Sequence, residues 1–264
     1  MAFLKLKDAQ LFYQWDGPDN KPVLVFSNSL GSTHRMWDPQ LDAFTRHFRV
    51  LRYDGRGHGQ STSTPGPYSV EQLAGDVVQL LDALKLDRVY FCGLSMGGMI
   101  GMHLGAAYAA RFHKIVLCNT AAKIGTPDVW NARITAVQAG GMKAVAGAVI
   151  DRWLTAAFRA AHPGEAATLL SMLESCNPAG YTANSCAVRD ADFRQKLGSI
   201  QVATQVVTGT HDPSTPPADG RWLSEQIRGA KCTELSAAHL SNIEARDDFN
   251  REVLAFLISE GAHG

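Results

Sequence analysis

Residues 93–97 read Gly93-Leu94-Ser95-Met96-Gly97, which is the pattern G-x-S-x-G. It follows an apolar run at residues 89–92 and opens a segment of helical character at residues 96–109. A serine on a sharp strand-to-helix turn has a strained backbone, and glycines two residues to either side leave room for the turn. The Ser95 hydroxyl would stand beside a helix N-terminus, which favours negative charge. The pattern therefore predicts a nucleophilic serine, rather than an incidental serine in a glycine-rich turn.

A neutral serine is a poor nucleophile and needs a general base, which in turn needs a carboxylate to fix its tautomer. His239 lies in a loop after the strand-like residues 232–235, and we predict that it is the base. Asp212 follows a buried apolar run, in a turn built by Gly209 and Pro213, and we predict that it supplies the carboxylate. The sequence thus predicts a serine, histidine and aspartate triad.

Two neighbouring residues compete for these roles. Asp219 is the nearest other acid, but we expect it to start a helix. His211 lies beside Asp212, and we expect it to be a solvated loop residue.

The negative charge that forms on a carbonyl oxygen during acyl transfer needs two hydrogen-bond donors, an oxyanion hole. The backbone N–H of Met96, directly after the serine, is the first predicted donor. The second should come from the loop at residues 27–31, which follows the strand-like residues 23–26, and we assign it to the N–H of Leu30. Both donors are main-chain groups, so side-chain identity matters little at either position.

Short apolar runs recur along the chain and are typical of strands covered on both faces of a parallel sheet. Residues 70–84 place their apolar side chains on one helical face, with Ser69 as the N-cap and Gln72 placed as in a capping box. Two antiparallel strands are expected at residues 3–6 and 11–15. Strands that alternate with helices predict an α/β fold with a mainly parallel sheet. Further strands are expected at residues 23–26, 49–53, 89–93, 115–118, 202–208 and 232–235.

The character of the chain changes between residues 120 and 196, which are rich in alanine and glycine and show no clear strand. We predict a helical lid inserted into a core formed by residues 1–119 and 197–264. Ligands of α/β proteins bind at the carboxyl ends of the strands, where such a lid would lie. The alternative is a set of packing helices with no part in the site.

A glycine-rich loop at residues 54–61 follows the strand that ends at Tyr53. It lacks the spacing of both phosphate-binding glycine motifs. We expect a tight structural loop near the mouth of the site, with Asp54 and Arg56 holding the turn.

Composition excludes several classes of function. The 264 residues include 25 Lys plus Arg and 25 Asp plus Glu, so nothing favours nucleic acid or an anionic membrane as partner. The N-terminus resembles a strand rather than a signal peptide, which predicts a cytoplasmic protein. The five cysteines contain no C-x-x-C and the nine histidines show no metal-ligand spacing, so we expect neither disulfides nor a metal or cofactor. Oligomeric state is left open.

These motifs together resemble the α/β-hydrolase superfamily along essentially the whole chain, including its serine, aspartate, histidine order. Within it, several stretches resemble the β-ketoadipate (3-oxoadipate) enol-lactone hydrolases. The most restrictive are the loop at residues 27–31, which has Asn28-Ser29 where many hydrolases of this fold have His-Gly, and residues 119–125. Residues 53–59, 93–101 and 237–244 also match. Met96 stands where these lactonases usually have leucine, and the lid from Trp130 to Arg189 matches less distinctly.

The resemblance implies an eight-stranded sheet flanked by helices and a reaction that needs no cofactor. Its substrate would be a small carboxylated lactone, which water opens to 3-oxoadipate during bacterial breakdown of catechol and protocatechuate. The substrate carboxylate needs a cation near the lid, for which Arg133 and Lys123 are candidates, with Trp130 as an apolar wall. Arginine suits bidentate carboxylate binding better. A solvated helix residue is the alternative for Arg133.

Other activities on this fold remain open from sequence. A general carboxylesterase, a C–C hydrolase and a cofactor-free perhydrolase share the triad and differ in the shape of the pocket. A binding protein that keeps the fold without turnover is a further alternative, which the intact Ser95, Asp212 and His239 disfavour.

Overall fold

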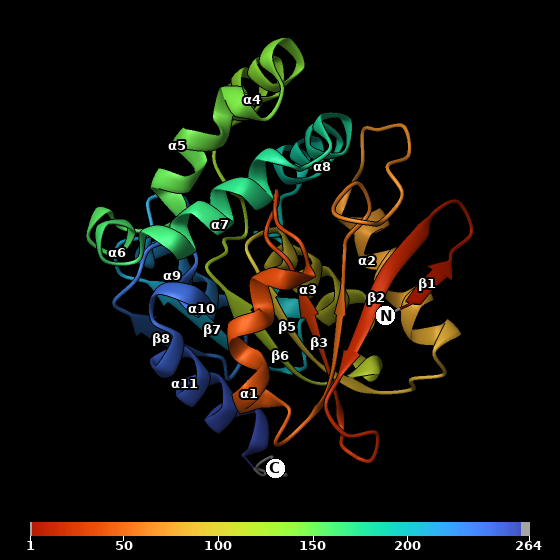
Figure 1. The fold of residues 1–264 in the computed structure, drawn as a ribbon. Coiled ribbons are helices and arrows are strands. Elements are labelled where there is room, and N and C mark those ends of the chain that lie inside the picture. Colours follow the sequence, from red (N-terminus) through yellow and green to blue (C-terminus); the bar gives the residue numbers. More distant parts are fainter. Residues whose placement is uncertain (1, 260–264) are drawn as a thin grey trace.

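The computed structural model describes residues 2–259, which form an eight-stranded sheet with helices on both faces (Figure 1). The strands are β1 (Ala2–Lys5), β2 (Gln10–Asp16), β3 (Val23–Ser27), β4 (Arg49–Tyr53), β5 (Val89–Leu94), β6 (Phe112–Cys118), β7 (Ala203–Gly209) and β8 (Lys231–Leu235). They lie in the order β1-β2-β4-β3-β5-β6-β7-β8. Strand β2 pairs antiparallel with β1 and β4, and every pair from β4 to β8 is parallel. The predicted mainly parallel sheet is confirmed.

The helices of the core cover the two faces of this sheet. They are α1 (Leu41–Phe44), α2 (Val70–Ala83), α3 (Met96–Ala107), α9 (Pro217–Gln226), α10 (Ser241–Glu244) and α11 (Arg246–Ile258). Short 3₁₀ segments are η1 (His34–Gln40), η2 (Ala109–Arg111) and η3 (Leu197–Ser199). Figure 1 shows α1 and α11 on one side of the sheet and α2 and α3 on the other. The parallel strands β3 to β7 are therefore buried between helices, as their continuous apolar runs require, whereas the edge strand β8 is mostly half-buried or exposed.

Strand β6 begins three residues earlier than its apolar pattern predicts, at Phe112 instead of Ile115. The polar pair His113 and Lys114 interrupts the pattern. Lys114 is nevertheless buried, because its ammonium group donates hydrogen bonds to the carbonyls of Phe256 (2.7 Å) and Ser259 (2.6 Å) at the end of α11. The strand thus continues through a lysine whose partners are distant in sequence.

Helix α2 forms as its pattern predicts. The Ser69 hydroxyl caps it by accepting a hydrogen bond from the Gln72 N–H at 3.1 Å. Its buried residues lie at the predicted helical spacing and include Val70, Leu73, Ala74, Val77, Leu80 and Leu81. The helix is held to the sheet by this apolar face, since isolated helices of this length are marginal in water.

Helix α3 packs closely on the centre of the sheet because it presents glycines to it. A Cβ at Gly101 would lie 2.9 Å from side-chain atoms of Leu117 and Phe91. A Cβ at Gly105 would lie 3.1 to 3.2 Å from Ile200 and Ile115. This close contact fixes the N-terminus of α3 against the end of β5, where Ser95 lies.

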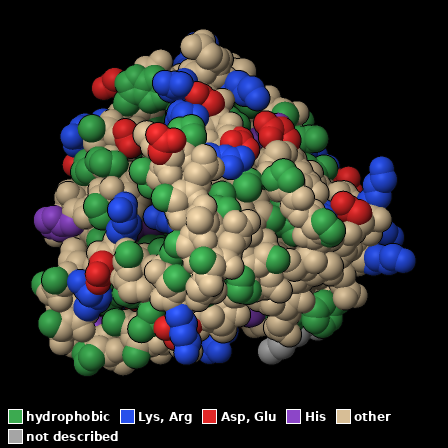
Figure 2. All heavy atoms as spheres, turned by 90° about the horizontal axis from the view of Figure 1, so that it is seen from above, with side chains coloured by type: hydrophobic (Ala, Val, Ile, Leu, Met, Phe, Trp, Pro, Cys, Tyr) green, Lys and Arg blue, Asp and Glu red, His purple; other side chains and the backbone are tan. Residues whose placement is uncertain are grey.

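Five helices follow β6 and precede β7, and we call them the cap. They are α4 (Pro127–Gly140), α5 (Lys143–Trp153), α6 (Ala156–Ala161), α7 (Pro163–Glu174) and α8 (Pro178–Asp190). The cap lies above the carboxyl ends of the strands, on the same side as the N-terminus of α3 (Figure 1). Acidic and basic side chains are interspersed on the face seen from above (Figure 2).

Among residues 2–259, no helix is long and apolar enough to cross a membrane.

Candidate active site

The turn between β5 and α3 places Ser95 in a conformation that side chains rarely adopt, with φ at +58° and ψ at −111°. The flanking glycines are sterically required. A Cβ at Gly93 would lie 2.1 Å from the carbonyl oxygen of Gly97, and a Cβ at Gly97 would lie 2.3 Å from that of Ser27. The strained, glycine-dependent turn that the sequence predicts is confirmed.

Three hydrogen bonds to the ends of two strands hold this turn. The Ser95 N–H donates to the Cys118 carbonyl at 2.9 Å, and the Ser95 carbonyl accepts from the Thr120 hydroxyl at 2.8 Å. The Gly97 N–H donates to the Asn28 carbonyl at 3.1 Å. The peptide groups on either side of Ser95 are therefore fixed by the ends of β6 and β3.

His239 and Asp212 form a buried pair at the ends of β8 and β7. The Nδ1 atom of His239 lies 2.7 Å from Oδ2 of Asp212. The carboxylate also accepts hydrogen bonds from the backbone N–H groups of Ser214 and Thr215 and from the Thr215 hydroxyl. Burial acts to raise the pKa of Asp212, but His239 and these hydrogen bonds outweigh it and leave the pKa below its usual value. Asp212 is thus a stabilised anion that orients the imidazole.

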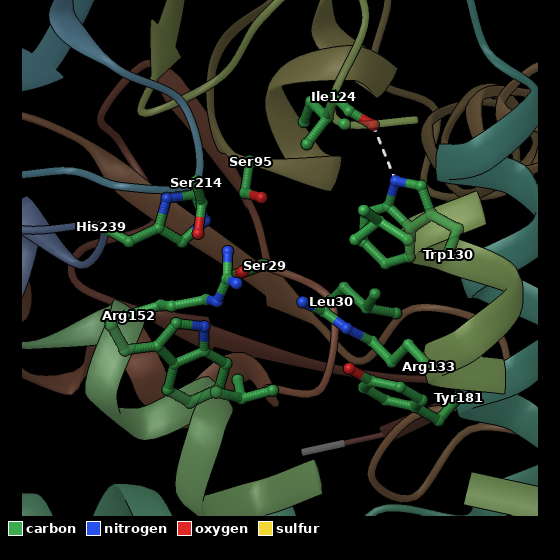
Figure 3. A pocket seen from close by; sticks show the side chains of 14 residues that line it. Ser29, Leu30, Ser95, Ile124, Trp130, Arg133, Arg152, Tyr181, Ser214 and His239 are labelled. Atoms are coloured by element: carbon green, nitrogen blue, oxygen red, sulfur yellow. Dashed lines mark hydrogen bonds between the residues drawn. The ribbon is translucent and has the colours of Figure 1, made fainter. Parts of the chain in front are cut away.

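Ser95 and His239 line the same cavity (Figure 3). Within residues 2–259 the Ser95 hydroxyl makes no hydrogen bond with the imidazole. Catalytic hydrogen bonds are often long in unliganded enzymes and tighten when substrate binds. The structure therefore places Ser95 and His239 in the same cavity, and Asp212 orients the imidazole.

Asn119 is a site residue that the sequence pattern did not single out. It follows β6 with φ at +42°, and its side chain is fully buried. Its Nδ2 donates to Oδ2 of Asp212 (3.1 Å) and to the Ala238 carbonyl (3.2 Å), while its Oδ1 accepts from the Ser241 hydroxyl at 2.5 Å. Asn119 thus ties the carboxylate to the loop that carries His239. Its left-handed backbone and buried amide were not foreseeable without the strand order.

Both predicted oxyanion donors are backbone amides that are free to bind a ligand. In the described chain, neither the Leu30 N–H nor the Met96 N–H has a protein acceptor. The amides beside them are occupied, because Ser29 N–H donates to the Met36 sulfur and Gly31 N–H donates to Nε2 of His58. Leu30 also lines the cavity with Ser95.

The cavity beside Ser95 is small, with a volume of about 70 Å³, and it is partly open to solvent. The core contributes Ser29, Leu30, Ser95, Ser214 and His239, and the cap and the segment leading to it contribute Ile124, Gly125, Val129, Trp130, Arg133, Val149, Arg152, Trp153 and Tyr181. The cap therefore supplies walls of the cavity, and it is not merely packing. No cluster of three or more His, Cys, Asp or Glu side chains that could hold a metal ion occurs within residues 2–259.

Two arginines of the cap point their guanidinium groups into this cavity (Figure 3). Arg133 lies over the Trp130 ring, with 4.7 Å from its guanidinium carbon to the ring centroid, and beside the Tyr181 hydroxyl. Arg152 enters from α5 toward Ser29 and His239. Among the described residues neither arginine has an acidic partner, and the lining contains no Asp or Glu. The cavity therefore carries uncompensated positive charge beside Ser95.

The sequence prediction about these cations needs one correction. Arg133 and Trp130 do line the cavity, but Lys123 does not, since its ammonium lies 3.8 Å from the Asp192 carboxylate. Arg152 lines the cavity instead, and the sequence did not indicate it because a helix pattern does not reveal which polar residues face the core. Arg152 and Trp153 are adjacent in sequence at the end of α5.

The competing residues lie as predicted. His211 is exposed in the turn after β7. Asp219 is in the first turn of α9, where burial and the neighbouring Asp212 charge raise its pKa. Neither residue lines the cavity. In the 54–61 loop, Asp54 accepts from the Gln60 N–H across the turn as predicted, whereas Arg56 pairs with Asp76 on α2 and anchors the loop from outside. No residue of this loop lines the cavity.

The fold and the chain resemble known hydrolases. A family model described as the alpha/beta hydrolase fold matches residues 22–142. Two curated Acinetobacter baylyi proteins, 3-oxoadipate enol-lactonase 1 and 3-oxoadipate enol-lactonase 2, are 41% and 38% identical to this chain. The alignments cover 90% and 96% of this chain, and 90% and 95% of those proteins.

Solved structures give the same result. The crystal structure of the enol-lactonase from Burkholderia xenovorans LB400 has a TM-score of 0.97 and 45% sequence identity, covering 98% of this chain and 100% of that one. The crystal structure of a hydrolase from Pseudomonas aeruginosa PA01 has a TM-score of 0.95 and 42% identity, covering 98% of each chain. This chain is therefore a hydrolase of the α/β-hydrolase family and belongs to the same group as the 3-oxoadipate enol-lactonases.

Proposed function

We propose that this protein hydrolyses the lactone ring of 3-oxoadipate enol-lactone to give 3-oxoadipate, a step in bacterial aromatic breakdown. One observation carries the proposal: Arg133 and Arg152, without acidic partners in the described chain, converge on the cavity that exposes Ser95. Like charges that converge repel one another, and an anion between them removes that cost. The relatives' names support the same substrate class, a small lactone that carries a carboxylate.

The proposed first half-reaction forms an acyl-enzyme. The Ser95 oxygen attacks the lactone carbonyl carbon while Nε2 of His239 takes the hydroxyl proton. The negative charge that develops on the carbonyl oxygen is received by the N–H groups of Leu30 and Met96. The bond from the carbonyl carbon to the ring oxygen then breaks. The departing enolate accepts the proton from His239 and becomes a ketone, tethered within the acyl chain.

The proposed second half-reaction returns the free enzyme. A water molecule gives a proton to His239 and attacks the acyl carbon, and the same two amides receive the second oxyanion. Collapse of this intermediate breaks the bond to Ser95, whose oxygen takes the proton back from His239. The balance is one lactone and one water consumed and one keto acid released. Asp212 keeps the imidazole oriented and stabilises its charged form in both halves.

The test is an ultraviolet assay of enol-lactone loss, run beside p-nitrophenyl acetate as a neutral aryl ester. We expect efficient hydrolysis of the lactone, weak hydrolysis of the ester, and loss of both activities in Ser95→Ala. Equal or faster turnover of the aryl ester would reassign the protein as a general esterase. Lactone hydrolysis that survives in Ser95→Ala would contradict the mechanism.

A further inference from the structure

We infer that His58 is a positioning residue for the oxyanion hole: it accepts a hydrogen bond from the Gly31 N–H and thereby aims the preceding amide, Leu30 N–H, into the cavity. The inference rests on the proposed function, because it takes the Leu30 amide as a donor to the oxyanion. His58 lies in the glycine-rich loop at residues 54–61, far from Ser95 in sequence. It does not line the cavity itself.

The contact between the two loops is direct and buried. The Gly31 nitrogen lies 2.8 Å from Nε2 of His58, and the histidine is 2% exposed. Gly31 has φ at +84°, and a Cβ there would lie 2.6 Å from a methyl of Leu173. The turn therefore needs glycine, and its N–H has a single protein acceptor in the described chain, His58.

Three hydrogen bonds fix the peptide groups around Leu30. The Ser29 carbonyl accepts from the Ser32 N–H (3.2 Å) and the Ser32 hydroxyl (2.8 Å). In a trans peptide the C=O and N–H point in opposite directions, so these bonds turn the Leu30 N–H away from Ser32. The bond to His58 fixes the next peptide group, which joins Leu30 to Gly31. With both flanking peptide planes held, the two backbone dihedrals of Leu30 have no freedom.

The loop that carries His58 is itself held by the cap. The Asn184 amide nitrogen, on α8, donates to the Arg56 carbonyl at 2.8 Å. Backbones also meet here, because a Cβ at Gly180 would lie 2.1 Å from the Gly57 carbonyl oxygen. The cap therefore presses on the loop that holds the oxyanion amide, which links the position of α8 to the geometry at Ser95.

His58 must be neutral to accept this bond. The imidazole accepts at Nε2 only when that nitrogen carries no proton, so in the neutral ring the proton lies on Nδ1. Burial lowers the pKa of His58 from 6.5 to about 4, against smaller opposing effects of the Arg56 carbonyl and the Asp54 charge. The acceptor is therefore present throughout the neutral pH range.

The first measurement uses the unaltered protein. In ¹⁵N-labelled protein a scalar coupling across the hydrogen bond is expected between the Gly31 nitrogen and Nε2 of His58. The His58 nitrogen shifts should also show a proton on Nδ1. Absence of the coupling, or a proton on Nε2, overturns the inference without reference to any variant.

The second measurement compares variants that keep or lose an acceptor at the same place. The oxygen of His58→Gln reaches the position of Nε2, that of His58→Asn is too short, and His103→Gln is the control on a partly buried histidine outside the cavity. We expect His58→Asn to lower kcat about tenfold to hundredfold with KM unchanged, because transition-state stabilisation is lost and substrate binding is not. His58→Gln should stay within about threefold of the unaltered protein.

The readout is kcat and KM for both the enol-lactone and p-nitrophenyl acetate, with the rate at which a fluorophosphonate labels Ser95. Equal effects of His58→Asn and His58→Gln, or an effect on KM alone, overturn the inference. The aryl ester separates the two proposals. If the unaltered protein fails to hydrolyse the lactone, the proposed function fails, while the dependence of ester hydrolysis on His58 still decides this inference.

Discussion

At the scale of single residues, the site contains groups that react with the substrate and groups that hold the reacting groups in position. Ser95, His239 and Leu30 line the cavity, whereas Asp212, Asn119 and His58 do not line it and hydrogen-bond to residues at or beside it. Asp212, Asn119 and His58 are buried. Asp212 and Asn119 make hydrogen bonds to the loop that carries His239, and His58 makes one to the loop at residues 27–31. Their substitution should therefore lower rates without changing what binds.

The first prediction concerns Asp212. Asp212→Asn keeps the size of the side chain but removes the charge and favours the wrong imidazole tautomer, so we expect kcat to fall by about 10⁴-fold. Fluorophosphonate labelling of Ser95 should slow in parallel, while circular dichroism stays unchanged. The control is Asp219→Asn, at the nearest other acid, which should stay close to the unaltered protein. Equal losses in both variants would show that Asp212 is not the residue that orients His239.

The second prediction concerns the cavity arginines. Arg133→Ala or Arg152→Ala should raise KM for the enol-lactone about tenfold to hundredfold, since a charge-assisted hydrogen bond contributes about 1.5–3 kcal/mol. Hydrolysis of p-nitrophenyl acetate, which has no carboxylate, should change little. Arg228→Ala, at an exposed arginine before β8, serves as the control. A uniform loss on both substrates would indicate a structural role instead of carboxylate recognition.

At the scale of secondary-structure elements, the sequence predicted the sheet well and the cap poorly. Buried parallel strands appear as short apolar runs, and the serine turn follows from a local glycine pattern, so neither needs knowledge of distant contacts. Arg152 and Asn119 could not be found in this way. Their roles come from which helix face meets the core and from the neighbours of β6, and neither leaves a local pattern. Lys123 was wrong for the same reason, since its partner Asp192 lies at the far end of the cap.

The third prediction compares two glycines within cap helices. Gly180→Ala places a methyl group 2.1 Å from the Gly57 carbonyl oxygen, so α8 must move away from the 54–61 loop. We expect a loss of about 2–4 kcal/mol in the free energy of unfolding, with lower kcat. Gly147→Ala is the matched control, because a Cβ there meets nothing within 4 Å. That variant should gain about 0.5–1 kcal/mol, as expected for alanine over glycine in a helix interior.

Urea denaturation followed by circular dichroism gives both free energies. Equal stability changes in the two variants would show that α8 does not press on the loop.

At the scale of the whole molecule, the contact between the cap and the 54–61 loop contains His58, whose protonation makes the stability of the fold sensitive to pH. His58 is neutral in the folded protein at neutral pH, because burial lowers its pKa to about 4. In the unfolded chain its pKa returns to about 6.5, so between these values the unfolded state holds a proton that the folded state lacks. Unfolding is therefore favoured as pH falls through this window, and the effect is absent above it.

The fourth prediction follows from this difference. The free energy of unfolding should fall by about 3 kcal/mol between pH 6.5 and pH 4 on account of His58 alone. His58→Gln lacks this contribution, so the difference in stability between the two proteins should shrink as pH falls. Burial also lowers the pKa of His103 and His113, but these residues are present in both proteins and cancel in the difference. A difference that does not vary with pH would mean that His58 is protonated equally in both states.

The central claim is that Ser95 is a nucleophile activated by His239, and titration with a fluorophosphonate tests it most directly. We expect one equivalent to modify the protein, mass spectrometry of the digest to place the adduct on Ser95, and enol-lactone hydrolysis to fall in proportion to labelling. His239→Ala should remain folded and resist the reagent. Full enol-lactone hydrolysis by protein whose Ser95 is completely modified would contradict the account.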